Sequence, residues 1–142
     1  MYLSYVGIRV TNLERSLDFY TGLFHLEVVS RGDNGPRGGG TYALLKDEKS
    51  GHKLELNYYP ETSPYAVPYV PGEGLDHIAF RVRDVEETLL LLVKRGVERI
   101  DIPASLADLE EGVRVAYVKD PDRNWIELYQ NPRPIVEVPK GY

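Results

Sequence analysis

The spacing of apolar residues predicts a strand followed by an amphipathic helix at the start of the chain. Residues 2–10 alternate small or polar side chains with apolar ones and are rich in β-branched and aromatic types, which is typical of a strand. A set of apolar residues then recurs at helical spacing: Leu13, Leu17, Tyr20 and Phe24. With Asn12 placed to cap it, this pattern predicts a helix over 13–23 that covers one face of a sheet.

Three more strands are expected in the first half of the chain, over 26–30, 41–46 and 52–59. The stretch between the first two of them, RGDNGPRGGG at 31–40, consists of turn-forming residues. It lacks the glycine spacing of a phosphate-binding loop and does not lead into a helix. The first half of the chain therefore predicts one β-α-β-β-β module over residues 2–59.

The second half predicts the same order of elements after a proline-rich linker. Residues 60–73 carry four prolines, so we expect this linker to be extended. A strand at 74–82 is followed by a helix that Asp84 caps and that ends at Gly96. The remaining segments are strands near 98–102, 112–119 and 124–130, a loop at 103–111 with room for a short helical turn, and a tail at 131–142.

The two halves of the chain repeat each other at an offset of 72 residues. Residues 5–10, YVGIRV, align with residues 77–82, HIAFRV, and residues 54–56, LEL, align with residues 126–128, IEL. A repeat that holds its register over both ends indicates two copies of one supersecondary unit. We therefore predict an α+β fold in which modules 2–59 and 74–130 form a single domain over residues 1–142.

Composition limits the kinds of partner that this chain can have. The 142 residues are enough for one domain, and a formal net charge of −5 without a cluster of Lys or Arg argues against nucleic acid and anionic membranes. The absence of cysteine excludes disulfides, thiolate metal sites and cysteine nucleophiles. No apolar run approaches the roughly 20 residues of a membrane span, and the N-terminus lacks a signal-peptide pattern. We expect a cytoplasmic protein with a small-molecule partner.

Four polar residues at matching places in the two modules are candidate metal ligands. Because side chains two apart share one face of a strand, Glu55, His77 and Glu127 lie opposite the apolar residues that face the helices. Tyr5 is at the place equivalent to His77. If both sheets curve around one hollow, these groups converge there. An imidazole and two carboxylates suit Zn²⁺, Mn²⁺, Fe²⁺, Co²⁺ or Ni²⁺.

Each of these residues also has an ordinary structural explanation. A single Glu on a strand is usually solvated, and a single His usually has a structural role. Arg9 and Arg81 are equivalent in the repeat, and they either face the same hollow or pair with a nearby carboxylate. His25 and His52 have no counterpart in the repeat, so we interpret both as surface residues.

Three motifs at their observed spacing resemble the vicinal oxygen chelate superfamily, and within it the glyoxalase I-like proteins. These motifs are GIRVTNLERSLDFY at 7–20, LDHIAFRV at 75–82 and KDPDRNWIEL at 119–128. The resemblance implies two tandem βαβββ modules that form an open, cup-shaped, barrel-like sheet with the helices outside and a divalent metal inside. It places the metal ligands at Glu55, His77 and Glu127, with Tyr5 as a further candidate.

The resemblance also implies an activity. It predicts a metal-dependent lyase or isomerase that acts on a 2-oxoaldehyde thiol adduct, or a related α-hydroxycarbonyl, through an enediolate, with Glu127 as the catalytic base. The residues expected to bind the substrate are Arg9, Asn57, Tyr59, Arg81, Trp125 and Tyr129. Because the cup of the glyoxalase I-like proteins forms between chains, we predict a homodimer in which Tyr5 and Glu55 of one subunit face His77 and Glu127 of the other.

Two departures from the family pattern leave other functions open. Tyr5 replaces the usual His or Gln, and Tyr59 stands where glyoxalase I has an Asn for glutathione. These departures favour, as an alternative, a metal-independent protein that closes Trp125, Tyr129 and Tyr59 around a flat, drug-type molecule. An acyl-CoA epimerase and a ring-cleaving dioxygenase of the same superfamily are further alternatives, because a fold does not choose among chemistries.

Overall fold

A computed structural model describes residues 4–33, 39–63, 66, 68–72, 75, 77–101, 108–110 and 112–132. The chain forms two compact units. Unit 1 is Met1–Gly74 with Asp120–Arg123, and unit 2 is Leu75–Lys119 with Asn124–Tyr142. Each unit pairs one helix with one sheet, so the predicted α+β class and the two modules are confirmed. The division of the chain into a single domain with a linker and a tail stays a prediction.

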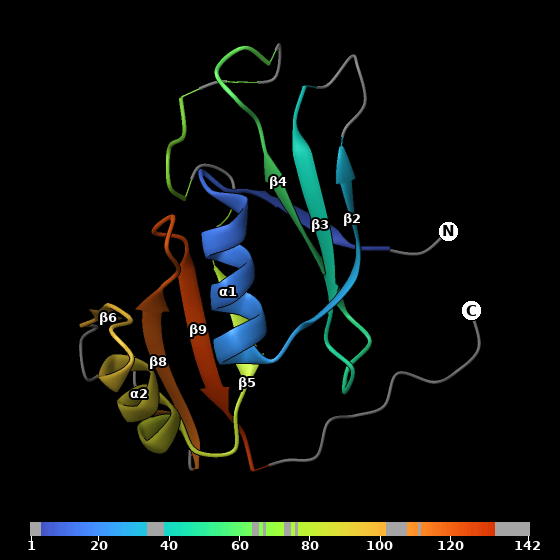
Figure 1. Cartoon of the computed structure of the whole chain (residues 1–142). Coiled ribbons are helices and arrows are strands. Elements are labelled where there is room, and N and C mark those ends of the chain that lie inside the picture. The colour runs from blue at the N-terminus through green and yellow to red at the C-terminus, as the bar shows by residue number, and fades with distance from the viewer. Residues whose placement is uncertain are drawn as a thin grey trace. The chain divides into compact units, whose positions relative to one another are not determined.

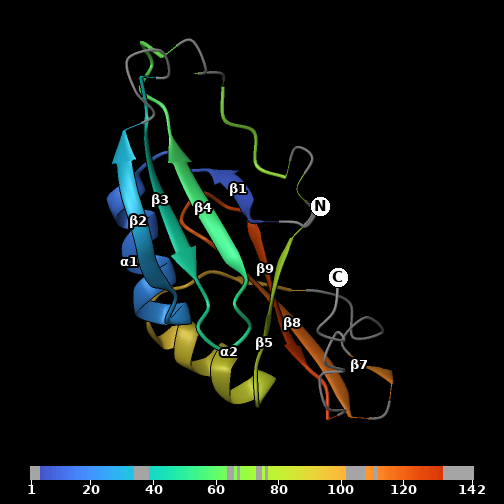
Figure 2. The same ribbon diagram turned by 90° about the vertical axis from the view of Figure 1, so that its right-hand side faces the viewer.

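Unit 1 contains one helix and a four-stranded sheet, as the apolar pattern predicted. Its elements are β1 (Val6–Arg9), α1 (Leu13–Phe24), β2 (Glu27–Asp33), β3 (Thr41–Lys46) and β4 (Lys53–Tyr58). The strand order is β1-β4-β3-β2, with β1 parallel to β4 and the other neighbours antiparallel (Figure 2). The strand β2 extends through Asp33, because its backbone continues to pair with β3 through the first residues of the predicted turn.

The helix α1 begins where its cap was predicted and lies against β3 and β4 (Figure 1). The Asn12 side chain accepts a hydrogen bond from the Arg15 backbone N–H at 3.0 Å. The buried residues of the helix are Leu13, Ser16, Leu17, Phe19 and Tyr20. Every second residue of β3 and β4 is buried as well: Ala43, Leu45, Leu54 and Leu56. Period-two burial of this kind leaves Glu55 and Asn57 on the opposite face of the sheet.

Unit 2 repeats this architecture with one additional short strand. Its elements are β5 (Ile78–Arg81), α2 (Val85–Lys94), β6 (Arg99–Ile100), β7 (Asp108–Glu110), β8 (Val113–Lys119) and β9 (Trp125–Gln130). The strand order is β5-β9-β8-β6, β7 also pairs with β8, and α2 lies against β8 and β9 (Figure 1). The Asp84 side chain caps α2 by accepting from the Glu87 backbone N–H at 2.9 Å, and Gly96 takes a φ of +84° just beyond its end.

The predicted connections differ from the structure in two details. The loop expected at 103–111 contains the strand β7 in its described part, because these residues pair with the start of β8. The linker expected to be extended begins with turns, in which Ser63 N–H donates to the Pro60 carbonyl and Ala66 N–H donates to the Ser63 carbonyl. Residues 133–142 of the predicted tail lie outside the described residues. Among the described residues, no helix has the length and apolar character needed to cross a membrane.

The internal repeat is visible in the strand register. In unit 1, β1 pairs with β4 so that Gly7 lies beside Glu55. In unit 2, β5 pairs with β9 so that Ala79 lies beside Glu127. All four residue pairs of the first ladder differ from those of the second by the same offset of 72. The duplication read from the sequence is therefore a duplication of strand pairing.

The turn between β8 and β9 belongs to unit 1, where the side chains of α1 hold it. The Asp122 carboxylate accepts hydrogen bonds from the Thr11 backbone N–H at 3.0 Å, from the Arg15 guanidinium at 2.9 Å and from the Ser16 hydroxyl at 3.1 Å. Its side chain is 1% exposed. A buried carboxylate costs stability unless donors surround it, and here they come from the first turn of one helix.

The second acidic residue of this turn, Asp120, is held by Tyr20. The Tyr20 hydroxyl donates to Asp120 Oδ2 at 2.8 Å, and the Asp122 backbone N–H donates to Asp120 Oδ1 at 2.9 Å. Burial, followed by the charge of Asp120 and this hydrogen bond, raises the pKa of Tyr20 well above its ordinary value. The phenol therefore stays protonated, and it remains a donor to Asp120 over the whole neutral range.

We expect Tyr20→Phe to lower the free energy of unfolding by about 1–3 kcal/mol, since it removes one partner of a buried carboxylate. Urea unfolding followed by circular dichroism measures this change. Tyr42→Phe is the matched control, because Tyr42 is half-buried in the same unit and has no hydrogen bond recorded for its hydroxyl. An equal loss of stability in both variants would contradict a special role for the Tyr20 hydroxyl.

Candidate active site

The His77 and Glu127 side chains meet on one face of the unit 2 sheet. His77 directly precedes β5, and Glu127 is in the middle of β9, beside Ala79 of β5. The imidazole Nε2 lies 3.0 Å from Glu127 Oε2, and the two side chains are 32% and 15% exposed. Ile126 and Leu128 are fully buried on the other face of β9, which fixes the direction in which Glu127 points. The prediction that these two residues share a face is confirmed.

A residue that the sequence analysis did not single out, Tyr117, completes this cluster. It lies in β8 directly opposite Glu127, and its hydroxyl donates to Glu127 Oε1 at 3.3 Å. Its ring meets the His77 ring nearly edge to face, with 5.8 Å between centroids. The ring of Trp125, which is 43% exposed, has its centroid 5.7 Å from that of the Tyr117 ring. The length of the turn between β8 and β9 was the signal that could have identified Tyr117, because it sets which residue faces Glu127.

In unit 1 the equivalent carboxylate, Glu55, has different neighbours. It is flanked by Gly7 of β1, and its Oε1 accepts a hydrogen bond from the Asn57 side-chain amide at 3.0 Å. A Cβ on Gly7 would come within 3.3 Å of the same amide, so the missing side chain leaves room for it. Tyr5 lies just before β1 and is 46% exposed, at the place equivalent to His77. No hydrogen bond between Tyr5 and Glu55 is recorded.

Arg9 and Tyr59 form a second pair in unit 1. The Arg9 guanidinium carbon lies 5.1 Å from the centroid of the Tyr59 ring, a cation–π contact. Gly40 packs against the same ring: a Cβ on Gly40 would be 2.7 Å from Tyr59 Cδ1 and 2.4 Å from the Tyr58 carbonyl oxygen. The sequence showed Gly40 only as part of a turn, and nothing local indicated that it approaches Tyr59.

The remaining predicted substrate residues lie in unit 2. Arg81 and Tyr129 are paired across β5 and β9. The Arg81 guanidinium donates to the Asn131 carbonyl at 2.7 Å, and the Asn131 amide donates to the Tyr129 hydroxyl at 2.6 Å. The described contacts of Arg81 therefore include a backbone carbonyl, and its pairing with a carboxylate stays a prediction.

The donor atoms present fit a divalent metal in part. Donors bound to one ion through bonds of about 2.1 Å at right angles lie about 3 Å apart, which is the 3.0 Å separation of His77 Nε2 and Glu127 Oε2. Among the described residues, however, no group of three or more His, Asp or Glu side chains is placed to hold an ion. Unit 2 thus offers an imidazole and a carboxylate, and unit 1 offers a carboxylate and the Tyr5 phenol.

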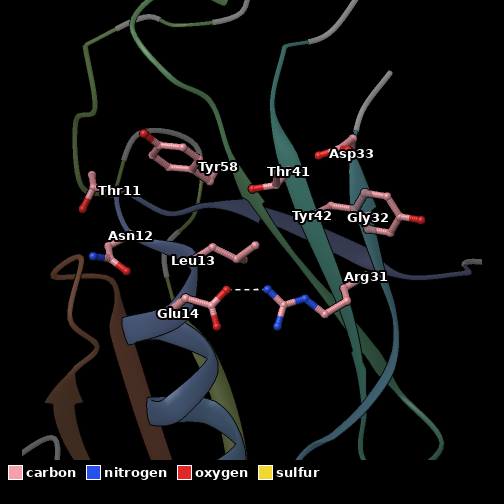
Figure 3. Close-up of a pocket in the computed structure, with 10 residues that line it drawn as sticks. All are labelled: Thr11, Asn12, Leu13, Glu14, Arg31, Gly32, Asp33, Thr41, Tyr42 and Tyr58. Atoms are coloured by element: carbon pink, nitrogen blue, oxygen red, sulfur yellow. Dashed lines mark hydrogen bonds and ion pairs between the residues drawn. The ribbon is translucent and has the colours of Figure 1, made fainter. Parts of the chain in front are cut away.

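A separate cavity of about 440 Å³ lies on the helix side of the unit 1 sheet (Figure 3). Its lining residues are Thr11, Asn12, Leu13, Glu14, Arg31, Gly32, Asp33, Thr41, Tyr42 and Tyr58. An ion pair between Glu14 and Arg31 crosses it, and both side chains are more than half exposed. An exposed pair of this kind contributes little to stability. None of the predicted site residues lines this cavity.

Comparisons with known proteins identify a superfamily that matches most of the chain. Residues 2–128 match the Glyoxalase/Bleomycin resistance protein/Dioxygenase superfamily. The chain is 32% identical over 133 residues to a lactoylglutathione lyase of Neisseria meningitidis, covering 92% of this chain and 91% of that protein. The trypanothione-dependent glyoxalase I of Leishmania major is similar in structure, with 31% identity, a TM-score of 0.68 and coverage of 92% and 87%. The fosfomycin resistance protein FosX of Listeria monocytogenes, in complex with Mn(II), shares the fold, with 19% identity, a TM-score of 0.64 and 92% coverage of each chain.

We expect Gly40→Ala to lower the free energy of unfolding by about 1–3 kcal/mol, because the new Cβ collides with backbone that cannot move aside by rotation of a side chain. Urea unfolding measures the loss. Gly22→Ala in α1 is the matched control, since a Cβ there meets nothing within 4 Å, and alanine should stabilise the helix by up to about 1 kcal/mol. If both substitutions stabilise the protein, the close approach of Gly40 to Tyr59 is wrong.

Proposed function

Because the chain belongs to the glyoxalase/bleomycin resistance protein/dioxygenase superfamily, we propose that it is a metal-dependent lyase or isomerase of the glyoxalase I type. Relatives named lactoylglutathione lyase, about one-third identical over most of their length, support this activity. The single observation that carries the proposal is the pair formed by His77 and Glu127, 3.0 Å apart. Their repeat equivalents, Tyr5 and Glu55, occupy the same positions in the other module.

His77, Glu127 and Glu55 are the residues that would hold the metal, with Tyr5 as a further candidate. Imidazole and carboxylate ligands suit Zn, Ni, Co, Mn or Fe as divalent ions. Such an ion, when bound, would polarise two neighbouring oxygens of the substrate and stabilise the negative charge that develops on them. A neutral phenol is a weak ligand, so we expect Tyr5 to contribute less than the three other residues.

Glu127 is proposed as the residue that moves the proton. The substrate, a 2-oxoaldehyde thiol adduct or a related α-hydroxycarbonyl, carries a hydrogen on the carbon that bears the hydroxyl group. Glu127 takes this proton and returns it to the neighbouring carbon, while the hydroxyl proton passes to the neighbouring oxygen, so that the hydroxyl and carbonyl groups exchange places and no redox partner is consumed. The 15% exposure of the Glu127 side chain limits the access of water to it.

The substrate would be held by the polar and aromatic residues that share the two sheet faces. Arg9, stacked on Tyr59, offers a positive charge beside a flat ring, and Asn57 offers an amide beside Glu55. The residues proposed in unit 2 are Arg81, Trp125 and Tyr129. These residues include both cations and aromatic rings, so they suit a small, anionic, oxygen-rich adduct of a thiol.

A second function is favoured by the aromatic cluster of unit 2. Tyr117 and the exposed Trp125 lie side by side, and a flat molecule could bind over them without any metal. In this alternative the protein only binds a drug-type small molecule. His77 distinguishes the two functions. It is required to bind a metal, but it contributes little to the binding of a flat molecule stacked on Trp125.

We further propose that the active protein is a cytoplasmic homodimer with sites shared between subunits. Each module supplies only part of the ligand set, and a set from Glu55 of one subunit with His77 and Glu127 of the other would be complete. A two-fold axis would then create two equivalent sites.

The first test measures metal content and activity together. Wild-type protein dialysed against Ni²⁺, Zn²⁺ or Co²⁺ should retain metal and isomerise the methylglyoxal adduct of a small thiol. Loss of a residue that only supports a metal ligand typically lowers activity by about 10–100-fold. We expect His77→Ala, which removes a proposed ligand itself, to lower activity by more than this. His52→Ala, which replaces an exposed histidine, is the matched control and should change neither property. The proposal would be contradicted if the protein retained no metal and bound aromatic ligands equally well after treatment with EDTA and after His77→Ala. The binding alternative would then replace it.

The second test asks whether sites are shared between chains. Glu55→Ala and His77→Ala proteins, each inactive alone, are unfolded together and refolded as a mixture. In a heterodimer with shared sites, both substitutions fall in one site and the other site is intact. The mixture should then recover about a quarter of the wild-type activity, since about half of the dimers are mixed. A verified heterodimer without recovery, or a monomer by light scattering, would contradict the shared site.

A further inference from the structure

Two other rings lie close to the ring of Tyr117 in the sheet of unit 2. The His77 ring lies against it at 5.8 Å and 82°, and the Trp125 ring lies at 5.7 Å and 57°. Its backbone is held in the ladder between β8 and β9, directly opposite Glu127. A phenol held in this way delivers its hydroxyl to one point, so its contact with Glu127 reflects the packing of the ring as well as the hydrogen bond.

The two oxygens of the Glu127 carboxylate have different partners. Oε1 accepts from the Tyr117 hydroxyl at 3.3 Å, and Oε2 faces His77 Nε2 at 3.0 Å. A ring nitrogen that ligates a metal carries no proton, so Nε2 cannot hold Glu127 and bind an ion at the same time. The contact with His77 must therefore be given up on metal binding. The contact with Tyr117 involves no proposed ligand other than Glu127 and can persist.

The equivalent carboxylate in unit 1 has no such phenol opposite it. Glu55 pairs across the ladder with Leu44, an aliphatic residue, where Glu127 pairs with Tyr117. Among the described residues, the Glu55 side chain accepts a hydrogen bond from Asn57 on its own strand. The two modules thus differ at the residue that faces each carboxylate, and the phenol accompanies the carboxylate to which the proton transfer was assigned.

We propose that Tyr117 is the positioning residue for Glu127. Its hydroxyl holds Oε1 and thereby leaves Oε2 as the oxygen directed to the metal and to the substrate proton. This inference rests on the proposed function only for the step that Glu127 performs. The contact between Tyr117 and Glu127 is independent of that function and is tested in the metal-free protein as well.

The test compares Tyr117→Phe with wild-type protein. The phenylalanine keeps the ring beside His77 and Trp125 and removes only the hydroxyl. We expect kcat to fall by about 10–100-fold and Co²⁺ affinity to fall by about tenfold, as for other losses of an outer-shell partner. KM should stay within about twofold, because Tyr117 acts on Glu127 and not on substrate binding. The absorption bands of bound Co²⁺ should shift as the carboxylate reorients.

Tyr58→Phe is the matched control. Tyr58 is a half-exposed tyrosine on β4. It lies on the same face of the strand as Leu54 and Leu56, opposite the face that carries Glu55. Loss of its hydroxyl should change neither kcat nor the affinity for Co²⁺. If Tyr117→Phe behaves like Tyr58→Phe in both measurements, the positioning role is overturned.

A double-mutant cycle with Glu127→Leu separates positioning from packing. If Tyr117 acts through Glu127, Tyr117→Phe should change Co²⁺ affinity by less than about twofold once Glu127 is leucine. An undiminished effect in that background would mean that Tyr117 acts through packing, and the proposal would fail. The same cycle, read as the midpoint of urea unfolding without metal, should show a loss on Tyr117→Phe that disappears in the Glu127→Leu background.

The outcomes distinguish this inference from the proposed function. If the wild-type protein shows no lyase turnover but the double-mutant cycle shows coupling between Tyr117 and Glu127, the proposed activity is refuted. The positioning of Glu127 by Tyr117 is then supported on its own. Turnover and metal binding in the wild type, with no coupling in either cycle, would leave the activity standing and overturn the role of Tyr117.

Discussion

The parallel pairing of the first and last strand in each module is the constraint on which the candidate site depends. It places a small residue beside each carboxylate, Gly7 beside Glu55 and Ala79 beside Glu127. The parallel ladder also holds the residue before β5, His77, close enough to reach the carboxylate of β9. Because the side-chain period of a strand is two, a shift of one residue in either ladder would turn the carboxylate into the core. Strand register, rather than any loop, therefore positions these acidic groups.

The two modules share a backbone pattern and differ in the chemistry that they present. In unit 2 the carboxylate contacts an imidazole and a phenol, and an indole lies beside that phenol. In unit 1 the carboxylate accepts from an amide, and the same unit carries a phenol at 46% exposure and a cation stacked on a ring. One duplicated framework thus supplies two unlike halves of a ligand set. Among the described residues, no group of three or more His, Asp or Glu side chains is placed to hold an ion, and this is the physical reason for the proposal that both modules contribute ligands.

Buried charge has a structural use in this chain as well as a proposed catalytic one. Asp120 and Asp122 are almost fully buried, and α1 surrounds Asp122 with donors from Thr11, Arg15 and Ser16. Breaking such a network leaves a desolvated charge with too few partners, which costs far more than an exposed ion pair contributes. The motif KDPDRN therefore stabilises unit 1, in addition to contributing to the family resemblance.

The sequence by itself determined the α+β class, the duplication, the caps of both helices and the faces of the strands, because these follow from local spacing and from the 72-residue offset. It also indicated the superfamily through three motifs. Only the tertiary structure decided which side chains meet. Tyr117 reaches Glu127 through the register of a hairpin, Gly40 reaches Tyr59 across the sheet, and Asp122 reaches α1 over more than a hundred residues. Such contacts join residues far apart in the chain, and local periodicity carries no information about their partners.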